Sequence, residues 1–212
     1  MTEKYELRLA ELLSSKLCHD LISPIGAINN GLEFLAEDSS DMRDEATKLI
    51  GNSARQAAER LAYFRMALGA GGATDTVEFN IVIDLIEKLS VEKKVELIWT
   101  GAEAYFHSNI TKTNSKLILN LALISFDCLP RGGKIEISLT NNTESPDITI
   151  AISGEKCNFR DDVKIGMNSE ISEDSLTVRN VLAFYCVKLA NSCEKTLKLR
   201  DEFPSLIVFG VS

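Results

Sequence analysis

The sequence predicts an α+β protein in which an N-terminal helical hairpin precedes a layer of helices packed on one face of a sheet. Apolar residues recur every three or four positions through residues 3–36, the spacing of one face of a long helix. The same spacing, now rich in alanine, returns in residues 41–68. After the glycine-rich segment 69–73, short segments alternate apolar and polar residues, as strands do. This change of period predicts two domains, residues 1–70 and 74–212.

The first helix is expected over residues 3–36 and would be roughly 50 Å long at 1.5 Å per residue. Pro24 interrupts it, and a proline inside a helix removes one backbone hydrogen bond and bends the helix. The polar segment 38–41 ends it with good capping residues. Its apolar stripe comprises Leu9, Leu13, Leu17, Leu21, Ile25, Ile28, Leu32 and Leu35.

The second helix is expected over residues 41–68, and the many alanines on its apolar face allow a neighbouring helix to approach closely. Its apolar face comprises Ala46, Leu49, Ile50, Ala54, Ala57, Ala58, Leu61, Phe64 and Leu68. Two helices alone cover each other's apolar stripes poorly. Pairing two hairpins completes the burial, so we expect a homodimer built on a four-helix bundle.

The remainder of the chain predicts a sandwich with helices on one face of a mainly antiparallel sheet. Helices are expected at residues 80–90, 113–129 and 175–191. Strands are expected at residues 95–100, 134–140, 147–153, 196–200 and 205–211. A hairpin connection at 141–146 and a turn at 203–204 join neighbouring strands.

The net charge of −8 argues against nucleic acid and against an anionic membrane as partners, because both attract basic surfaces. No stretch approaches the roughly 20 apolar residues of a membrane helix, and the N-terminus lacks the pattern of a signal peptide. The five cysteines include no CxxC pair, which favours reduced thiols in the cytoplasm and disfavours a metal site.

His19 is the residue most suited to chemistry. By helical geometry it lies about 160° from both Leu17 and Leu21, so it points away from the apolar stripe. A neutral imidazole is a good nucleophile near pH 7. The neighbouring Asp20 could orient the ring or accept a proton, or it could be an ordinary surface charge.

The helix face around His19 carries small residues where lysine and glutamate are usual. The small residues within about 40° of His19 are Ser15, Ser23, Gly26 and Asn30, and they leave room for another protein to dock. Gly26 is the strongest indication of a docking surface, because glycine costs an exposed helix about 1 kcal/mol relative to alanine. Leu12 could serve as an apolar anchor for the partner. The expected docking surface comprises Leu12, Ser15, Lys16, Ser23, Gly26 and Asn30; the alternative is that these are indifferent surface residues.

Residues 19–25, HDLISPI, resemble the H-box of sensor histidine kinases, in which a histidine is followed by an acid, Leu, any residue, Ser or Thr, Pro and an aliphatic residue. This resemblance implies that His19 is the phosphoacceptor. It also implies catalytic roles for Asp20 and Ser23, and a helix bend at Pro24.

Residues 119–135 are similar to the N-box region of the ATP-binding domain that follows this hairpin in kinases. The asparagine that would hold Mg²⁺ is replaced by Ile124, and the basic residue three positions later by Asp127. The two glycine-rich boxes are replaced by the segments 153–157 and 174–180. Without such glycines a backbone cannot approach phosphate closely. We therefore expect a domain of the histidine kinase ATPase type that has lost its nucleotide site.

The run GAINNGLEFL at residues 26–35 and LPRGGKI at 129–135, together with the features above, resemble the ChpT-type histidine phosphotransferases of alphaproteobacteria. The resemblance implies a dimer that accepts a phosphoryl group on His19 from the receiver domain of a hybrid histidine kinase. It then passes the group to response regulators, without ATP-dependent kinase activity. Receivers bring their own Mg²⁺, so no cofactor is expected in this chain.

Three alternatives remain open at this stage. The chain could be an adaptor that binds receivers without phosphotransfer. It could be a phosphatase that uses Ser23 or Asp20 to position water. It could also be an ATP-dependent kinase with a divergent nucleotide site, which Ile124 and the missing glycines disfavour.

Overall fold

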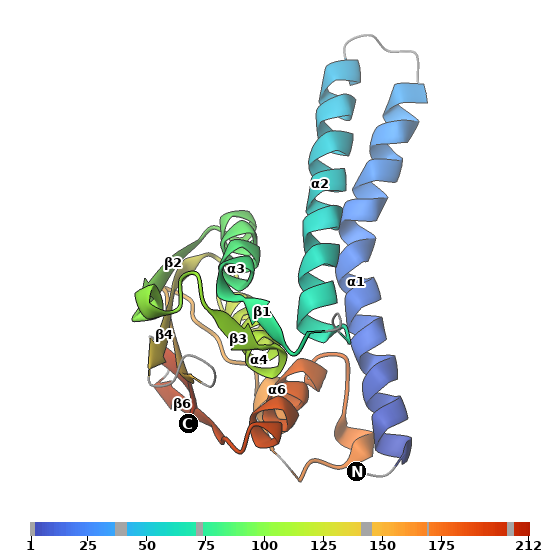
Figure 1. The fold of residues 1–212 in the computed structure, drawn as a ribbon. Helices are drawn as coiled ribbons and strands as arrows, with labels where there is room; N and C mark the ends of the chain where they lie inside the picture. The colour runs from blue at the N-terminus through green and yellow to red at the C-terminus, as the bar shows by residue number, and fades with distance from the viewer. Residues whose placement is uncertain (1–2, 37–41, 71–73, 141–145, 169, 203–205) are drawn as a thin grey trace.

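The computed structural model describes residues 3–36, 42–70, 74–140, 146–168, 170–202 and 206–212. Two helices, α1 (Glu3–Ala36) and α2 (Arg43–Leu68), form the predicted hairpin. They stand side by side in Figure 1, and the rest of the chain packs against their lower half. The polar break expected at 38–41, the turn expected at 203–204 and all but the last residue of the hairpin connection expected at 141–146 lie outside the described residues.

The second part is built on a five-stranded sheet with the order β2-β4-β5-β7-β6. The strands are β2 (Val95–Thr100), β4 (Gly133–Thr140), β5 (Asp147–Ser153), β6 (Leu197–Glu202) and β7 (Leu206–Val211). The pair β2–β4 is parallel and the other neighbours are antiparallel, which confirms the expected mainly antiparallel sheet. Two further strands, β1 (Thr76–Glu78) and β3 (Asn109–Thr111), pair with each other. They are too short to show a period in the sequence.

A layer of three helices lies between the sheet and the hairpin (Figure 1). It consists of α3 (Phe79–Lys93), α4 (Lys112–Asp127) and α6 (Val181–Ser192). A short helix α5 (Asp161–Gly166) and two 3-10 turns, η2 (Ala102–Ala104) and η3 (Glu173–Ser175), complete the described elements.

The helix expected at 175–191 begins later, at Val181. The reason is the side chain of Asn180, which accepts a hydrogen bond from the Thr177 backbone N–H at 2.8 Å and donates to the Ser175 carbonyl at 2.9 Å. Such side-chain bonds to the backbone compete with helix formation in the residues that they engage.

The two hairpin helices approach closely at Gly31. A Cβ atom there would lie 2.6 Å from Cγ1 of Ile50, a distance that real contacts do not tolerate. Ala46, which is buried on α2, lies at the same level: its carbonyl oxygen would be 3.3 Å from that Cβ. The small residues of the two helices therefore set their separation.

The lower end of α1 is buried against the second part of the chain, which corrects the expectation for Leu12. This side chain is only 5% exposed and packs with Ile171, Leu176 and Phe184. It cannot anchor a docking partner, because the protein's own α6 region covers it. Leu9 and Leu13 of the predicted stripe also pack there, so this end of the stripe is partly buried within one chain.

The end of α2 is tied to α4 by two side chains. The Tyr63 hydroxyl donates to the Leu119 carbonyl at 2.7 Å, and burial raises the pKa of Tyr63 well above its ordinary value, so the hydroxyl keeps its proton. The Asn120 amide donates to the Ala67 carbonyl at 2.9 Å. That carbonyl belongs to the last turn of α2, where carbonyls lack a helical donor. Both bonds fix the hairpin on the helical layer.

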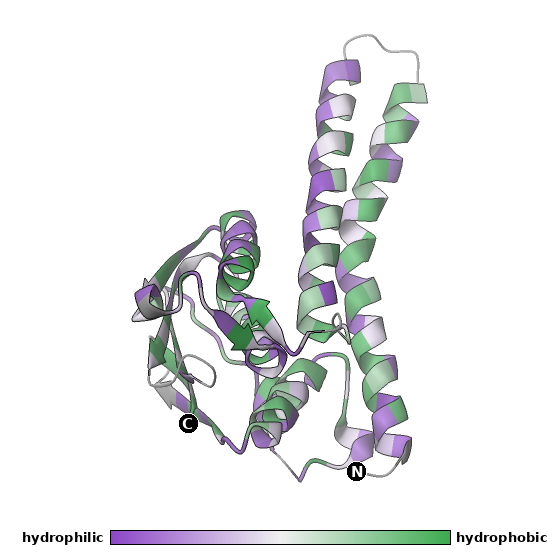
Figure 2. Ribbon diagram, viewed as in Figure 1, coloured by the Kyte–Doolittle hydropathy of each residue, from purple (hydrophilic) through white to green (hydrophobic). Residues whose placement is uncertain are grey.

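Figure 2 shows hydrophilic and hydrophobic positions interspersed along both hairpin helices. Among the described residues, no helix combines the length and the apolar character needed to cross a membrane. Large apolar side chains of the hairpin are nevertheless exposed in a single chain, including Leu7, Ile22, Ile25, Leu32, Phe34, Leu35, Leu49 and Leu61. Part of the predicted stripe thus lies in water unless another molecule covers it.

Candidate functional site

His19 lies on α1 with 77% of its side chain exposed, as its position away from the stripe predicts. Its Nδ1 lies 3.0 Å from Oδ1 of Asp20. An ionised carboxylate can only accept hydrogen bonds. We therefore assign the ring proton to Nδ1, which donates a hydrogen bond to Asp20. In the neutral ring the lone pair is then on Nε2. The site therefore presents a nucleophilic nitrogen to solvent.

Asp20 is held in place by Lys16, one turn earlier on α1. The Lys16 ammonium lies 2.9 Å from Oδ2 and 3.1 Å from Oδ1 of Asp20. It also lies 3.9 Å from Oδ2 of Asp127 at the end of α4. The side chains of Lys16 and Asp20 are only 17% and 20% exposed, so this pair is less screened by solvent than a surface ion pair. Lys16 thus orients the carboxylate that contacts His19.

A groove of about 780 Å³ lies between α1 and the second part of the chain, beside His19. Its walls include the basic side chains of Lys93, Arg160 and Arg179. Arg160 is paired with Asp162 at 2.6 Å. The lining also includes Ser15, Lys16, His19, Asp20, Ile124, Asp127, Cys128, Asn158, Val163, Val178, Leu182 and Ala183. The groove can hold an anionic group next to the imidazole.

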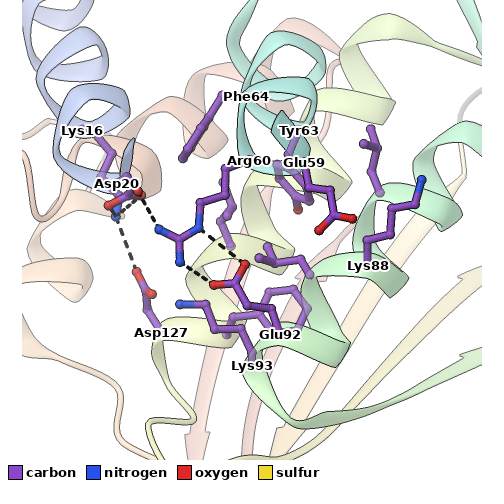
Figure 3. A pocket seen from close by; sticks show the side chains of 14 residues that line it. Lys16, Asp20, Glu59, Arg60, Tyr63, Phe64, Lys88, Glu92, Lys93 and Asp127 are labelled. Carbon is purple, nitrogen blue, oxygen red and sulfur yellow. Dashed lines mark hydrogen bonds and ion pairs between the residues drawn. The ribbon is translucent and has the colours of Figure 1, made fainter. Parts of the chain in front are cut away.

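A smaller cavity of about 90 Å³ lies on the other side of Asp20, between α1, α2, α3 and α4 (Figure 3). Apolar side chains such as Phe64 and Leu123 line part of it. Arg60 reaches from α2 toward Asp20 on one side and toward Glu92 of α3 on the other. The site is thus built from both parts of the chain.

The structure brings together only some of the predicted site residues. Ser15 and Lys16 line the same groove as His19 and Asp20, and the Ser15 hydroxyl donates to the Glu11 carbonyl at 2.9 Å. Ser23 and Asn30 are exposed, about one and three turns further along α1. Gly26 lies between them, and a Cβ there would have no atom within 4 Å.

The positions aligned with nucleotide-binding residues carry other contacts. Ile124 is 5% exposed and presents an apolar side chain to the groove. Asp127 faces Lys16. A Cβ at Gly154 would lie 2.9 Å from Cδ2 of Leu129, so this glycine serves internal packing.

An exposed histidine on a helical hairpin, next to a sheet domain of this topology, is the arrangement expected of a histidine phosphotransferase. Residues 81–202 match the family model for the histidine phosphotransferase C-terminal domain, and the chain belongs to this family. It is 33% identical over 185 residues to the protein phosphotransferase ChpT of Brucella abortus (strain 2308), covering 87% of this chain and 86% of that protein.

The solved structure of a bacterial phosphotransferase superposes with a TM-score of 0.84 at 31% identity, covering 100% of this chain and 98% of that one. The catalytic domain of the histidine kinase ThkA aligns with a TM-score of 0.45 at 10% identity, over 64% of this chain and 94% of that one. The family resemblance inferred from the H-box and the replaced nucleotide motifs is confirmed.

Sequence reasoning missed the residues that reach the site from elsewhere in the chain, above all Arg60 and Glu92. One signal pointed to such a partner. Pro24 has no N–H, so the carbonyl of Asp20 needs a donor from outside its own helix. The sequence does not say which residue supplies it, because Arg60 is 40 positions away.

Replacing Gly26 with Ala is expected to raise the free energy of unfolding by about 0.5–1 kcal/mol, because alanine favours the helix and meets no atom of this chain. Gly51→Ala on α2, also without atoms within 4 Å of its Cβ, is the matched control. Urea titrations at one protein concentration give both values. Destabilisation by Gly26→Ala alone would mean that a second copy packs at this point.

Proposed function

We propose that this chain is a phosphorelay histidine phosphotransferase that carries the phosphoryl group on Nε2 of His19. The observation that carries the proposal is the hydrogen bond from Nδ1 to Asp20, which leaves Nε2 exposed beside a groove whose walls include Lys93 and Arg179. Family membership supports the same reaction class. The donor is a receiver domain of a hybrid histidine kinase, and the acceptors are response regulators. The five cysteines, which include no CxxC pair, favour a cytoplasmic relay.

In the accepting step, the Nε2 lone pair attacks the phosphorus of the receiver's aspartyl phosphate. The bond from phosphorus to the aspartyl oxygen breaks, and the aspartate leaves as a carboxylate. Nδ1 keeps its proton, so the positive charge gained by the ring lies 3.0 Å from the Asp20 carboxylate. Passing the group to a response regulator reverses these steps, with Mg²⁺ supplied by the receiver.

Receivers would contact α1 on both sides of His19. The surface we propose comprises Ser15 and Lys16 at the groove, and Ser23, Gly26 and Asn30 further along the helix. Ser23, one turn beyond His19, is close enough in the helix to contact the transferred group. The side chains of Lys93 and Arg179 across the groove favour an incoming phosphoryl group by charge.

We further propose that two chains form a homodimer through their hairpins. Exposed apolar side chains recur on the hairpin, with Ile25 and Leu32 at 48% and 52% exposure on α1 and Leu61 at 52% on α2. Covering each such side chain is worth about 1.5–3 kcal/mol when burial is complete. The hairpin of a second copy exposes the same apolar side chains, so two hairpins that pack together cover each other.

Label is expected on the wild-type protein from a receiver carrying radiolabelled phosphate, and not from radiolabelled ATP alone. His19→Ala should take up no label, whereas His107→Ala, the matched change at the other of the two histidines, should behave as wild type. Label from ATP alone would mean kinase activity. No label from several charged receivers would favour a receiver-binding adaptor.

Asp20→Asn is expected to slow phosphoryl transfer at saturating receiver by about ten-fold or more. The asparagine keeps an acceptor for Nδ1 but removes the charge that stabilises the phosphorylated ring. Rapid-quench measurement with a charged receiver gives the rate, and Glu6→Gln, an exposed change on the same helix, is the control. A wild-type rate for Asp20→Asn would assign Asp20 to surface charge.

Leu32→Glu is expected to convert a dimer into a single chain, because a charge would be buried at the interface between the hairpins. Light scattering after size exclusion gives the mass. Val91→Glu changes a side chain of α3 that is 78% exposed and should leave the dimer intact. A wild type of single-chain mass at micromolar concentration would contradict the proposed dimer.

A further inference from the structure

The H-box proline leaves a backbone group without its helical partner. In an α-helix the N–H of residue 24 donates to the carbonyl of residue 20. Pro24 has no N–H, and its ring crowds that carbonyl. The carbonyl belongs to Asp20, the residue that contacts His19. Pro24 is buried, and an unpaired backbone carbonyl away from water is costly.

Arg60 supplies the missing hydrogen bond. Its Nη1 donates to the Asp20 carbonyl oxygen at 2.6 Å, across from α2 to α1. In Figure 3 the guanidinium lies between Asp20 and Glu92, with dashed lines to both. This hydrogen bond between two helices takes the place of the helical hydrogen bond that Pro24 removes.

Glu92 of α3 holds the same guanidinium from its other side. Nη2 of Arg60 binds Oε1 of Glu92, and Nε lies 3.5 Å from Oε2. The Arg60 and Glu92 side chains are 18% and 19% exposed, so the pair is largely shielded from solvent. A planar guanidinium with five donors can grip a carboxylate and a carbonyl together, which a lysine ammonium does with less defined direction.

We propose that Arg60 is a positioning residue for phosphoryl transfer: fixed by Glu92, it replaces the hydrogen bond that Pro24 removes and holds the turn that carries His19 and Asp20. The inference rests on the proposed function of His19. It assigns the second part of the chain a role in the reaction at the H-box, through Glu92.

The effect on His19 passes through the backbone of Asp20. An α-helix that contains a proline bends easily at the point where the backbone hydrogen bond is missing. Arg60 binds the Asp20 backbone carbonyl, and Lys16 binds the Asp20 carboxylate. With both ends held, Asp20 keeps its 3.0 Å contact with Nδ1 of His19. Loss of Arg60 frees the turn, and Nδ1 loses a steady acceptor.

The test is a double-mutant cycle that combines Arg60→Met with Pro24→Ala. The Pro24→Ala change restores a backbone N–H for the Asp20 carbonyl, so Arg60 should then be dispensable. Arg60→Met in the natural background should lower the rate of transfer from a charged receiver about ten-fold at saturation, with the half-saturating receiver concentration within about two-fold. In the Pro24→Ala background, adding Arg60→Met should change the rate by less than about two-fold.

Two matched measurements accompany the cycle. Arg65→Met removes an exposed arginine one turn further along α2 and should transfer at the wild-type rate. The ring ¹⁵N signals of His19 should shift in Arg60→Met as the Nδ1–H tautomer loses its acceptor. Those of His107, the other of the two histidines, should stay in place.

Each outcome has one meaning. If the wild type accepts no phosphoryl group, the proposed function itself fails. If the wild type accepts it and Arg60→Met transfers at the same rate, only the role of Arg60 fails; the same holds if the losses from Arg60→Met are equal in both backgrounds. If Arg60→Met alone does not fold, the double variant is compared with Pro24→Ala. Similar rates support the role of Arg60, and a further ten-fold loss or failure to fold overturns it.

Discussion

The base of the hairpin is buried against the helical layer of the second part of the chain, and the geometry around His19 depends on this packing. Leu12 of α1, and Tyr63 and Ala67 of α2, are nearly inaccessible to solvent and belong to hydrophobic clusters that include α4 and α6. Removing a leucine side chain such as that of Leu12 from water stabilises the fold by about 1.5–3 kcal/mol. Apolar burial has no direction of its own, so hydrogen bonds and charges set the register of the packed helices.

Hydrogen bonds and ion pairs connect the helices next to this packed base. Lys16 connects α1 with Asp127 of α4, and Arg60 connects α1 and α2 with Glu92 of α3. Both connections meet at Asp20, which contacts the imidazole of His19. A short stretch of helix with a proline in it is thereby held from several sides. The exposed histidine sits on a rigid support and remains open to a docking protein.

The second part of the chain contributes side chains to the wall of the groove beside His19. Ile124 and Asp127 stand where the kinase pattern has a metal-binding asparagine and a basic residue. Ile124 now lines an apolar part of the groove, and Asp127 faces Lys16. These two side chains form an apolar and a charged part of the wall beside His19.

The sequence by itself determined the secondary-structure elements and led to the prediction that His19 is the reactive residue. Periodicity predicted both long helices and most strands, and the H-box pointed to His19, because both signals lie within one element. Only the tertiary structure decided that Leu12 is buried and that Arg60 and Glu92 reach the Asp20 turn. These residues meet across separate helices, at separations of 40 and 32 positions. A local sequence pattern predicts which face of a helix is apolar. Which element covers that face depends on the packing of the whole chain.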